Sequence, residues 1–313
     1  MRPREHKRCL AVLALLVILL LAGLAFWPEA PTGATGGWLT QAGLAPRLEL
    51  VEGVRVRYVR AGSGPPVLLI HGLASSIYTW SEVLPALSRE HEVVALDLPG
   101  FGGSDQPADL SGQAYLGVVR QLLDRLQIAR ATIVGHSLGG AVAVMLAAEH
   151  PERVERLALL APAGFNFAPS ELPGLLRAAS WPPVGALLER LPVRRALLRI
   201  GLRQVFFDAA LVTEERVEEY WAPLARPGAV ASLRALLASR AALADRFPAL
   251  AAQVRAPTLL VWGRQDAWIP VAQAARFLAA IRGSRAVILE ACGHMPQEEH
   301  PEQVVRLLRD LPR

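Results

Sequence analysis

The 313-residue sequence predicts an α/β fold, in which a mostly parallel, eight-stranded sheet carries helices on both faces. Short apolar runs bounded by turn residues recur along the chain, and segments of helical periodicity separate them. Several of these runs, such as residues 67–70, are apolar throughout, as expected for strands buried on both faces of a parallel sheet. One run leads through a glycine-rich turn that carries a serine into a helix of small residues. This alternation of strand and helix is typical of a doubly covered parallel sheet.

Residues 1–27 are expected to form a signal anchor or a signal peptide. Residues 10–27 carry no charge and, at ~1.5 Å per residue, span roughly 27 Å as a helix, which is enough for a bilayer core. Basic residues before this helix favour a cytoplasmic N-terminus, with the remaining chain periplasmic or extracellular. The same pattern fits a cleaved signal peptide, with Gly23 and Ala25 at the cleavage site, and a secreted domain. Residues 28–46, rich in proline and glycine, are expected to be a linker.

Composition excludes several classes of protein. Residues 1–8 hold three of the five net positive charges, so the rest of the chain is nearly neutral, which argues against a nucleic-acid partner. The two cysteines, Cys9 and Cys292, lie far apart in the sequence, so no disulfide framework is expected. Cys292 is expected to be an ordinary buried thiol, because no second cysteine or histidine pair stands at metal-ligand spacing.

The strands are expected in a regular order within the domain, residues 47–313. Two alternating segments, 48–51 and 54–59, flank a Glu-Gly turn and predict a β-hairpin. The final helix is expected from about residue 299 to residue 309. The remaining strands are expected at residues 67–70, 92–96, 131–134, 154–160, 258–262 and 285–289.

From about residue 165 to residue 247 no strand is evident, and prolines separate short helical patterns. This segment predicts a helical cap, inserted over the ends of the strands. Ligands of open α/β sheets bind beyond the carboxyl ends of the strands, so such a cap would enclose a substrate. Large apolar side chains of the cap are expected either to line a substrate pocket or to form the core of the cap itself; they are Trp181, Phe206, Phe207, Trp221 and Leu224.

The turn at residues 135–140 reads Gly-His-Ser-Leu-Gly-Gly and places Ser137 between a strand and a helix. Such a turn forces the serine into a strained conformation, and Gly135 and Gly139 allow the strand and the helix to approach closely. A serine hydroxyl is a weak nucleophile unless an imidazole accepts its proton and a carboxylate orients that imidazole. Ser137 is therefore the candidate nucleophile.

His294 and Asp266 are the candidate partners of this serine. His294 stands in a glycine-flanked loop after a strand, whereas His150 and His300 stand at helix ends. Asp266 follows the strand that ends at residue 262 and so emerges at the carboxyl edge of the sheet. A structural histidine and a turn aspartate are the alternative interpretations of these two residues.

From about residue 46 to the C-terminus the chain resembles the α/β-hydrolase superfamily. Besides the serine turn, the resemblance depends on His-Gly-Leu at residues 71–73, the glycine-rich run 97–104, Gly-Arg-Gln-Asp at 263–266 and Gly-His-Met-Pro at 293–296. It implies a triad in the chain order serine, acid, histidine, which matches Ser137, Asp266 and His294.

The resemblance also implies an oxyanion hole, formed by the backbone N–H groups of Leu73 and Leu138. His71 and His136 are expected to shape their loops by hydrogen bonding rather than to act as bases. The run 97–104 is expected to be structural, because it has neither a phosphate-loop lysine nor metal-ligand spacing.

As a function, the resemblance implies a membrane-anchored monoacylglycerol lipase or carboxylesterase. Such an enzyme hydrolyses esters of apolar acyl substrates through an acyl-enzyme and needs no metal or organic cofactor. Ser137 disfavours the haloalkane dehalogenases and epoxide hydrolases of this fold, which use an aspartate there. A carbon–carbon bond hydrolase and a non-catalytic ligand-binding protein stay open as alternatives. The sequence specifies neither the acyl-chain length, the leaving group nor the oligomeric state.

Overall fold

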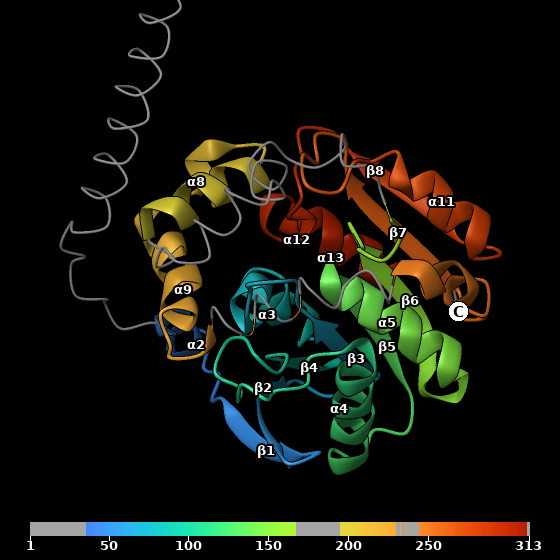
Figure 1. Ribbon diagram of the computed structural model, residues 1–313, viewed down its shortest axis with the longest axis horizontal. Coiled ribbons are helices and arrows are strands. Elements are labelled where there is room, and N and C mark those ends of the chain that lie inside the picture. The colour runs from blue at the N-terminus through green and yellow to red at the C-terminus, as the bar shows by residue number, and fades with distance from the viewer. Residues whose placement is uncertain (1–35, 167–194, 230–231, 233–235, 237–243, 312–313) are drawn as a thin grey trace, which may run out of the picture.

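An eight-stranded sheet forms the centre of the protein (Figure 1). The computed structural model describes residues 36–166, 195–229, 232, 236 and 244–311. The strands lie in the order β1-β2-β4-β3-β5-β6-β7-β8; β1 and β2 pair antiparallel at one edge, β2 pairs antiparallel with β4, and all other pairs are parallel. The predicted sheet is therefore confirmed. In chain order, its strands are β1 (Arg47–Val51), β2 (Val54–Ala61), β3 (Pro66–Ile70), β4 (Glu92–Leu96), β5 (Ala131–His136), β6 (Val154–Leu160), β7 (Thr258–Gly263) and β8 (Arg285–Leu289).

Helices cover both faces of this sheet, as the alternation of apolar strand residues shows. In β3, Leu68 and Ile70 belong to one buried cluster, whereas Val67 and Leu69 belong to the other. Successive side chains of a strand point to opposite faces, so two apolar layers flank the sheet. The first layer holds residues of α4 (Gly112–Arg125), α5 (Leu138–Glu149) and α11 (Gln273–Ala280); the second holds residues of α3 (Leu84–Leu87) and α13 (Pro301–Arg309).

The final helix ends at residue 309 as predicted and begins two residues after its predicted start, because a separate short helix precedes it. α12 spans Pro296–Glu299, and α13 begins only at Pro301. Between them His300 has φ −134° and ψ 55°, which is not helical. A proline disfavours the helical conformation of the residue before it and provides a natural first residue for a new helix. The short helix α12, which follows His294, is therefore separate from the C-terminal helix α13.

Part of the expected linker is packed against the domain. Residues 37–41 form the short helix α2 (Gly37–Gln41), and Leu39 is only 5% exposed, in the second apolar layer. The ring of Trp38 meets that of Tyr78 edge-on, with 6.2 Å between centroids. Because these two apolar side chains find partners, the prediction of a linker is wrong for this stretch of residues 28–46.

The predicted membrane anchor lies in residues 1–35, outside the described residues. Within the part of the chain that the structure describes, no helix has the length and apolar character needed to cross a bilayer. The anchor therefore stays a prediction from the sequence.

The described part of the segment between β6 and β7 is helical, as predicted for a cap. It contains α8 (Arg195–Val205), the 3₁₀ helix η4 (Ala209–Leu211) and α9 (Glu214–Leu224). In Figure 1, α8 and α9 lie beside the sheet rather than on either of its covered faces. The limits predicted for the cap, 165–247, stay a prediction, because residues 167–194 lie outside the described residues.

Candidate active site

Ser137 stands at the turn between β5 and α5. Its φ is +50° and its ψ is −114°, a conformation that costs energy for any residue with a side chain. The surrounding backbone holds it there: the Ser137 N–H donates to the carbonyl of Leu160 (3.0 Å), and the Ser137 carbonyl accepts from the Gly140 N–H (2.9 Å). The residue is 9% exposed. The strained turn expected from the sequence is present.

The two glycines that flank Ser137 are required by close backbone contacts. A Cβ on Gly135 would lie 2.4 Å from the carbonyl oxygen of Gly139. A Cβ on Gly139 would lie 2.2 Å from the carbonyl oxygen of Ile70, at the end of the neighbouring strand β3. The Gly135 contact confirms the prediction that a glycine there lets β5 and α5 approach closely, whereas Gly139 lets α5 approach the end of β3.

Asp266 and His294 form a buried hydrogen-bonded pair. The distance from His294 Nδ1 to Asp266 Oδ2 is 2.7 Å. The other carboxylate oxygen, Oδ1, accepts from the backbone N–H groups of Trp268 and Ile269, each at 2.8 Å. Since a carboxylate only accepts, His294 carries its proton on Nδ1 and keeps Nε2 as the basic nitrogen.

Trp268 was not expected as a site residue. Its indole ring stacks on the His294 imidazole, with 6.3 Å between centroids and 22° between planes. The stack restrains the plane of the imidazole while Asp266 fixes its direction. The only signal in the sequence is the position of the tryptophan, two residues after the candidate acid.

The serine turn, residues 135–140, lies beside the loop that carries His294. This loop, residues 290–295 between β8 and α12, is called the histidine loop below. His136 Nε2 lies 2.8 Å from the backbone carbonyl of His294, and the two imidazole rings are 4.9 Å apart. The Ser137 hydroxyl makes no hydrogen bond to any described residue. Hydrogen bonds of this type are often long in unliganded sites and shorten when a substrate binds. The structure thus joins Asp266 to His294 directly and places the Ser137 turn beside them.

Leu73 and Leu138, the candidate oxyanion donors, lie at backbone positions with free N–H groups. Leu138 is the first residue of α5, so its N–H has no partner within the helix. Among the described residues, the Leu73 N–H donates no hydrogen bond. The preceding Gly72 lies against the serine, since a Cβ there would be 3.1 Å from Ser137 Cβ and 2.8 Å from His136 Nδ1.

His71 and His136 shape loops, as expected. His71 Nε2 accepts from the Leu98 N–H (2.9 Å), and its Nδ1 donates to the carbonyl of Gly72 (2.7 Å). Burial lowers the pKa of His71, and burial together with the nearby His294 lowers the pKa of His136 well below its ordinary value. Both imidazoles are therefore held neutral and act as hydrogen-bonding supports of the site.

The run 97–104 is structural, as predicted. The buried Asp97 carboxylate accepts from the N–H groups of Ile77 and Gly103, each at 2.7 Å, and pairs with Arg57 Nε at 2.5 Å.

Cys292 is a buried free thiol whose pKa is raised by burial, which agrees with the structural role expected for it.

The candidate substrate-lining residues differ in their surroundings. Phe206 is 3% exposed and packs in an apolar cluster with Tyr78 of the body and Met295 of the histidine loop. Trp221 is buried, and Phe207 is half exposed. Trp181 lies outside the described residues. Phe206 thus belongs to the packing between cap and body, and a substrate contact of these side chains stays a prediction.

The sequence did not predict the buried polar cluster around Glu298, four residues after His294. Glu298 of α12 accepts from Thr79 Oγ1 (2.6 Å) and from the hydroxyl of Tyr220, and Arg216 Nε lies 3.1 Å from its second oxygen. Burial raises the pKa of Glu298 to about 7, although Arg216 and the hydrogen bonds oppose the rise. The signal in the sequence is the pair Glu298-Glu299, which follows the Gly-His-Met-Pro motif after one intervening residue, Gln297.

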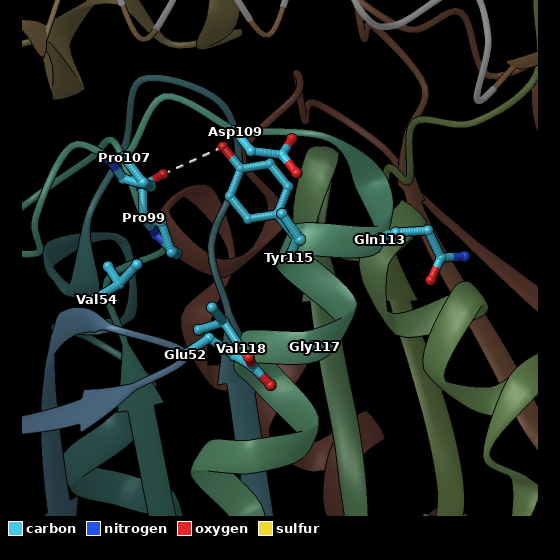
Figure 2. A pocket seen from close by; sticks show the side chains of 10 residues that line it. Glu52, Val54, Pro99, Pro107, Asp109, Gln113, Tyr115, Gly117 and Val118 are labelled. Carbon is cyan, nitrogen blue, oxygen red and sulfur yellow. Dashed lines mark hydrogen bonds between the residues drawn. The ribbon is translucent and has the colours of Figure 1, made fainter.

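A surface pocket of about 380 Å³ lies between the β1–β2 hairpin and α4 (Figure 2). The Tyr115 hydroxyl donates to the carbonyl of Pro99 at one side of it (3.2 Å). The pocket includes none of Ser137, Asp266 and His294, so it is separate from the candidate active site.

The sequence of residues 65–301 matches the family model described as alpha/beta hydrolase fold. A similar protein is the 2-hydroxymuconate semialdehyde hydrolase of Pseudomonas sp. (strain CF600), which is 32% identical over 270 residues. These residues are 83% of this chain and 91% of that protein.

Two solved structures are similar in fold. A meta-cleavage product hydrolase of Pseudomonas fluorescens superimposes with a TM-score of 0.75 at 27% identity and covers 85% of this chain and 96% of its own. A membrane phospholipase A, described as a bacterial virulence factor, gives a TM-score of 0.72 at 27% identity and covers 97% of both chains.

Proposed function

Since the chain belongs to the α/β-hydrolase fold family, we propose that it is a serine hydrolase that cleaves carboxylic esters of apolar acyl groups. The observation that carries the proposal is the buried Asp266–His294 pair beside the strained Ser137 turn. A carboxylate that fixes the tautomer of an imidazole next to a serine is the arrangement that activates a serine nucleophile.

In the proposed reaction, the Ser137 hydroxyl attacks the ester carbonyl while His294 Nε2 accepts its proton. This step requires the hydroxyl to reach Nε2 in the substrate complex. The N–H groups of Leu73 and Leu138 stabilise the oxyanion; the loss of one such donor typically costs about 100- to 1,000-fold in rate. His294 then protonates the departing alcohol, and a water molecule activated by His294 releases the acid. This chemistry needs no metal or organic cofactor.

The ester substrate is supported by similarity to the membrane phospholipase A, whose name states a lipid ester as its substrate. A monoacylglycerol or a related small lipid ester is the substrate that this similarity and the uncharged residues 10–27 support.

A carbon–carbon bond hydrolase is the second candidate. It is favoured by the similarity to 2-hydroxymuconate semialdehyde hydrolase and to the meta-cleavage product hydrolase. The same serine, acid and histidine would serve either reaction, so the described site does not separate the two candidates. A direct comparison of the two classes of substrate does separate them.

The test is an assay of the purified protein on p-nitrophenyl esters of increasing acyl length and on a vinylogous diketone. We expect faster turnover of the esters, and complete loss of it in Ser137→Ala with an unchanged circular dichroism spectrum. Faster turnover of the diketone would favour the second candidate. Retained esterase activity in Ser137→Ala would refute the assignment of the nucleophile. A folded protein that a fluorophosphonate does not label would instead favour a non-catalytic ligand-binding protein.

The location of the domain is a separate proposal, supported by the uncharged residues 10–27 and the basic residues before them. We expect the full chain to sediment with membranes and its domain to be accessible to protease from the extracytoplasmic side. Recovery of the full chain in the soluble cytoplasmic fraction would contradict it, whereas release of a shortened protein outside the cell would indicate a cleaved leader.

A further inference from the structure

We propose that Glu299 is a positioning residue for His294, because its carboxylate holds the backbone on both sides of the histidine and fastens it to the end of cap helix α8. The inference rests on the proposed function, in which His294 is the general base. Glu299 touches no reacting atom; it acts through the loop that carries the imidazole.

The first set of contacts lies within the histidine loop. Glu299 Oε1 accepts from the N–H of Gly293 at 2.8 Å and from the N–H of Met295 at 3.3 Å. These are the residues directly before and after His294. A single carboxylate oxygen therefore holds the peptide directly after His294, through the Met295 N–H, and the peptide that precedes Gly293, through the Gly293 N–H. Hydrogen bonds to a charged acceptor are stronger than neutral ones.

The second set of contacts joins the loop to the cap. Glu299 Oε2 accepts from the N–H of Phe207 at 2.7 Å, just beyond the end of α8. The His294 N–H donates to the carbonyl of Val205, the last residue of α8, at 2.8 Å. The backbone of residues 205–207 thus runs against that of the histidine loop, with Glu299 bridging the two.

Gly293 shows how close this approach is. A Cβ at this position would lie 2.4 Å from the Val205 carbonyl oxygen, 2.8 Å from the Phe207 nitrogen and 3.0 Å from Glu299 Oε1. Any other residue would separate the loop from the cap. Gly293 therefore allows the close contact between the histidine loop and the end of α8, and Glu299 adds hydrogen bonds to both. As a result, a displacement of α8 would move the backbone of His294.

The neighbouring Glu298 has different partners, which makes the role of Glu299 specific. The Glu298 carboxylate faces Thr79, Tyr220 and Arg216, all of them outside the histidine loop. Glu302, on the exposed first turn of α13, provides a matched control, because it has the same charge and its side chain is open to solvent.

The experiment compares wild type, Glu299→Gln and Glu302→Gln in the full chain. In Glu299→Gln, the new side-chain amide would present N–H groups to at least one of the backbone donors. We expect the rate of Ser137 modification by a fluorophosphonate to fall in this variant, by up to about 100-fold, since small misplacements of a catalytic group can cost that much. The far-downfield proton resonance of His294 Nδ1–H should shift or broaden in the same variant. Glu302→Gln should match wild type in both measurements.

The outcomes separate the two proposals. A folded wild type that the fluorophosphonate does not label refutes the proposed function itself. A labelled wild type with a Glu299→Gln rate within twofold of it, or with an unchanged Nδ1–H resonance, overturns the positioning role alone. If Glu299→Gln does not fold, Glu299→Asp replaces it, because the shorter carboxylate cannot reach both Gly293 and Phe207. The same drop in rate is then expected, and the wild-type rate again overturns the role.

Discussion

Replacement of Asp266 by asparagine separates the chemistry of the site from its stability. In the structure, Oδ1 of Asp266 accepts from two backbone N–H groups and Oδ2 accepts from His294 Nδ1. Asparagine keeps an oxygen for the two backbone donors and places an NH₂ group against Nδ1–H. Two donors cannot face each other, so the imidazole must move its proton to Nε2, the nitrogen that has to act as the base.

The expected magnitudes follow from this count of hydrogen bonds. A wrong tautomer in such a triad lowers kcat by about 10⁴-fold, equivalent to roughly 5 kcal/mol of barrier. Stability falls less, by about 1–2 kcal/mol, because after the change of tautomer Nδ1 accepts from the asparagine NH₂, so a hydrogen bond to a charged group is exchanged for a neutral one. Asp266→Ala also leaves the N–H groups of Trp268 and Ile269 without their acceptor. It should therefore lower the free energy of unfolding by a further amount on the order of 2–6 kcal/mol.

The assay is kcat/KM on a p-nitrophenyl ester, together with urea unfolding of both variants. Asp310→Asn, an exposed position on the last turn before the C-terminus, is the control for the loss of one carboxylate. If Asp266→Asn keeps more than a tenth of the wild-type activity, or if Asp266→Ala is no less stable than Asp266→Asn, the assignment of Asp266 is incorrect.

Three further predictions concern other parts of the domain. Gly139→Ala should prevent folding or destabilise the protein by more than the roughly 1–3 kcal/mol typical of overpacking, because its Cβ would lie 2.2 Å from a backbone oxygen; a variant with a wild-type unfolding midpoint would contradict the close contact. Glu298 binds a proton more tightly when folded, with a pKa of about 7, than when unfolded. Its contribution to stability should therefore be fully present below about pH 4.5 and be lost as the pH rises through 7; urea unfolding across that range should show a smaller decline in Glu298→Gln than in wild type, and equal declines would contradict the raised pKa. Cys292 is buried and its pKa is raised, so in a Cys9→Ser variant, which lacks the other cysteine, a thiol reagent should modify the protein at neutral pH only after denaturation; rapid modification of the native variant would show that Cys292 is accessible.

The central strands were predictable from the sequence because they are short apolar runs buried on both faces, whereas the edge hairpin β1–β2 was predictable from its alternating pattern around a Glu-Gly turn. The predicted strands 92–96, 154–160 and 285–289 agree with β4, β6 and β8 at both ends. The serine turn was predictable for a different reason, since Gly135 and Gly139 are needed wherever a strand turns this sharply into a helix.

Contacts between segments distant in sequence were not predictable. Glu299 acquires its role only because the fold brings residue 207 against residue 293, and Glu298 becomes buried only because α9 and the 3₁₀ helix at residues 77–80 close over it. Likewise, the proline-rich composition of residues 28–46 gave no indication that Leu39 would enter the core. Local patterns thus predict elements, whereas the supports of the site depend on tertiary contacts.

The neutral state of His136 has a consequence for the electrostatics of the reaction. His136 is 4.9 Å from His294, ring to ring, and its depressed pKa keeps it uncharged at physiological pH. In the proposed reaction His294 becomes an imidazolium; it then meets no second cation from this neighbour, and the Asp266 carboxylate lies in direct contact with it. Of the two adjacent imidazoles, only His294 would therefore take up and release a proton in the proposed reaction, while His136 stays neutral beside it.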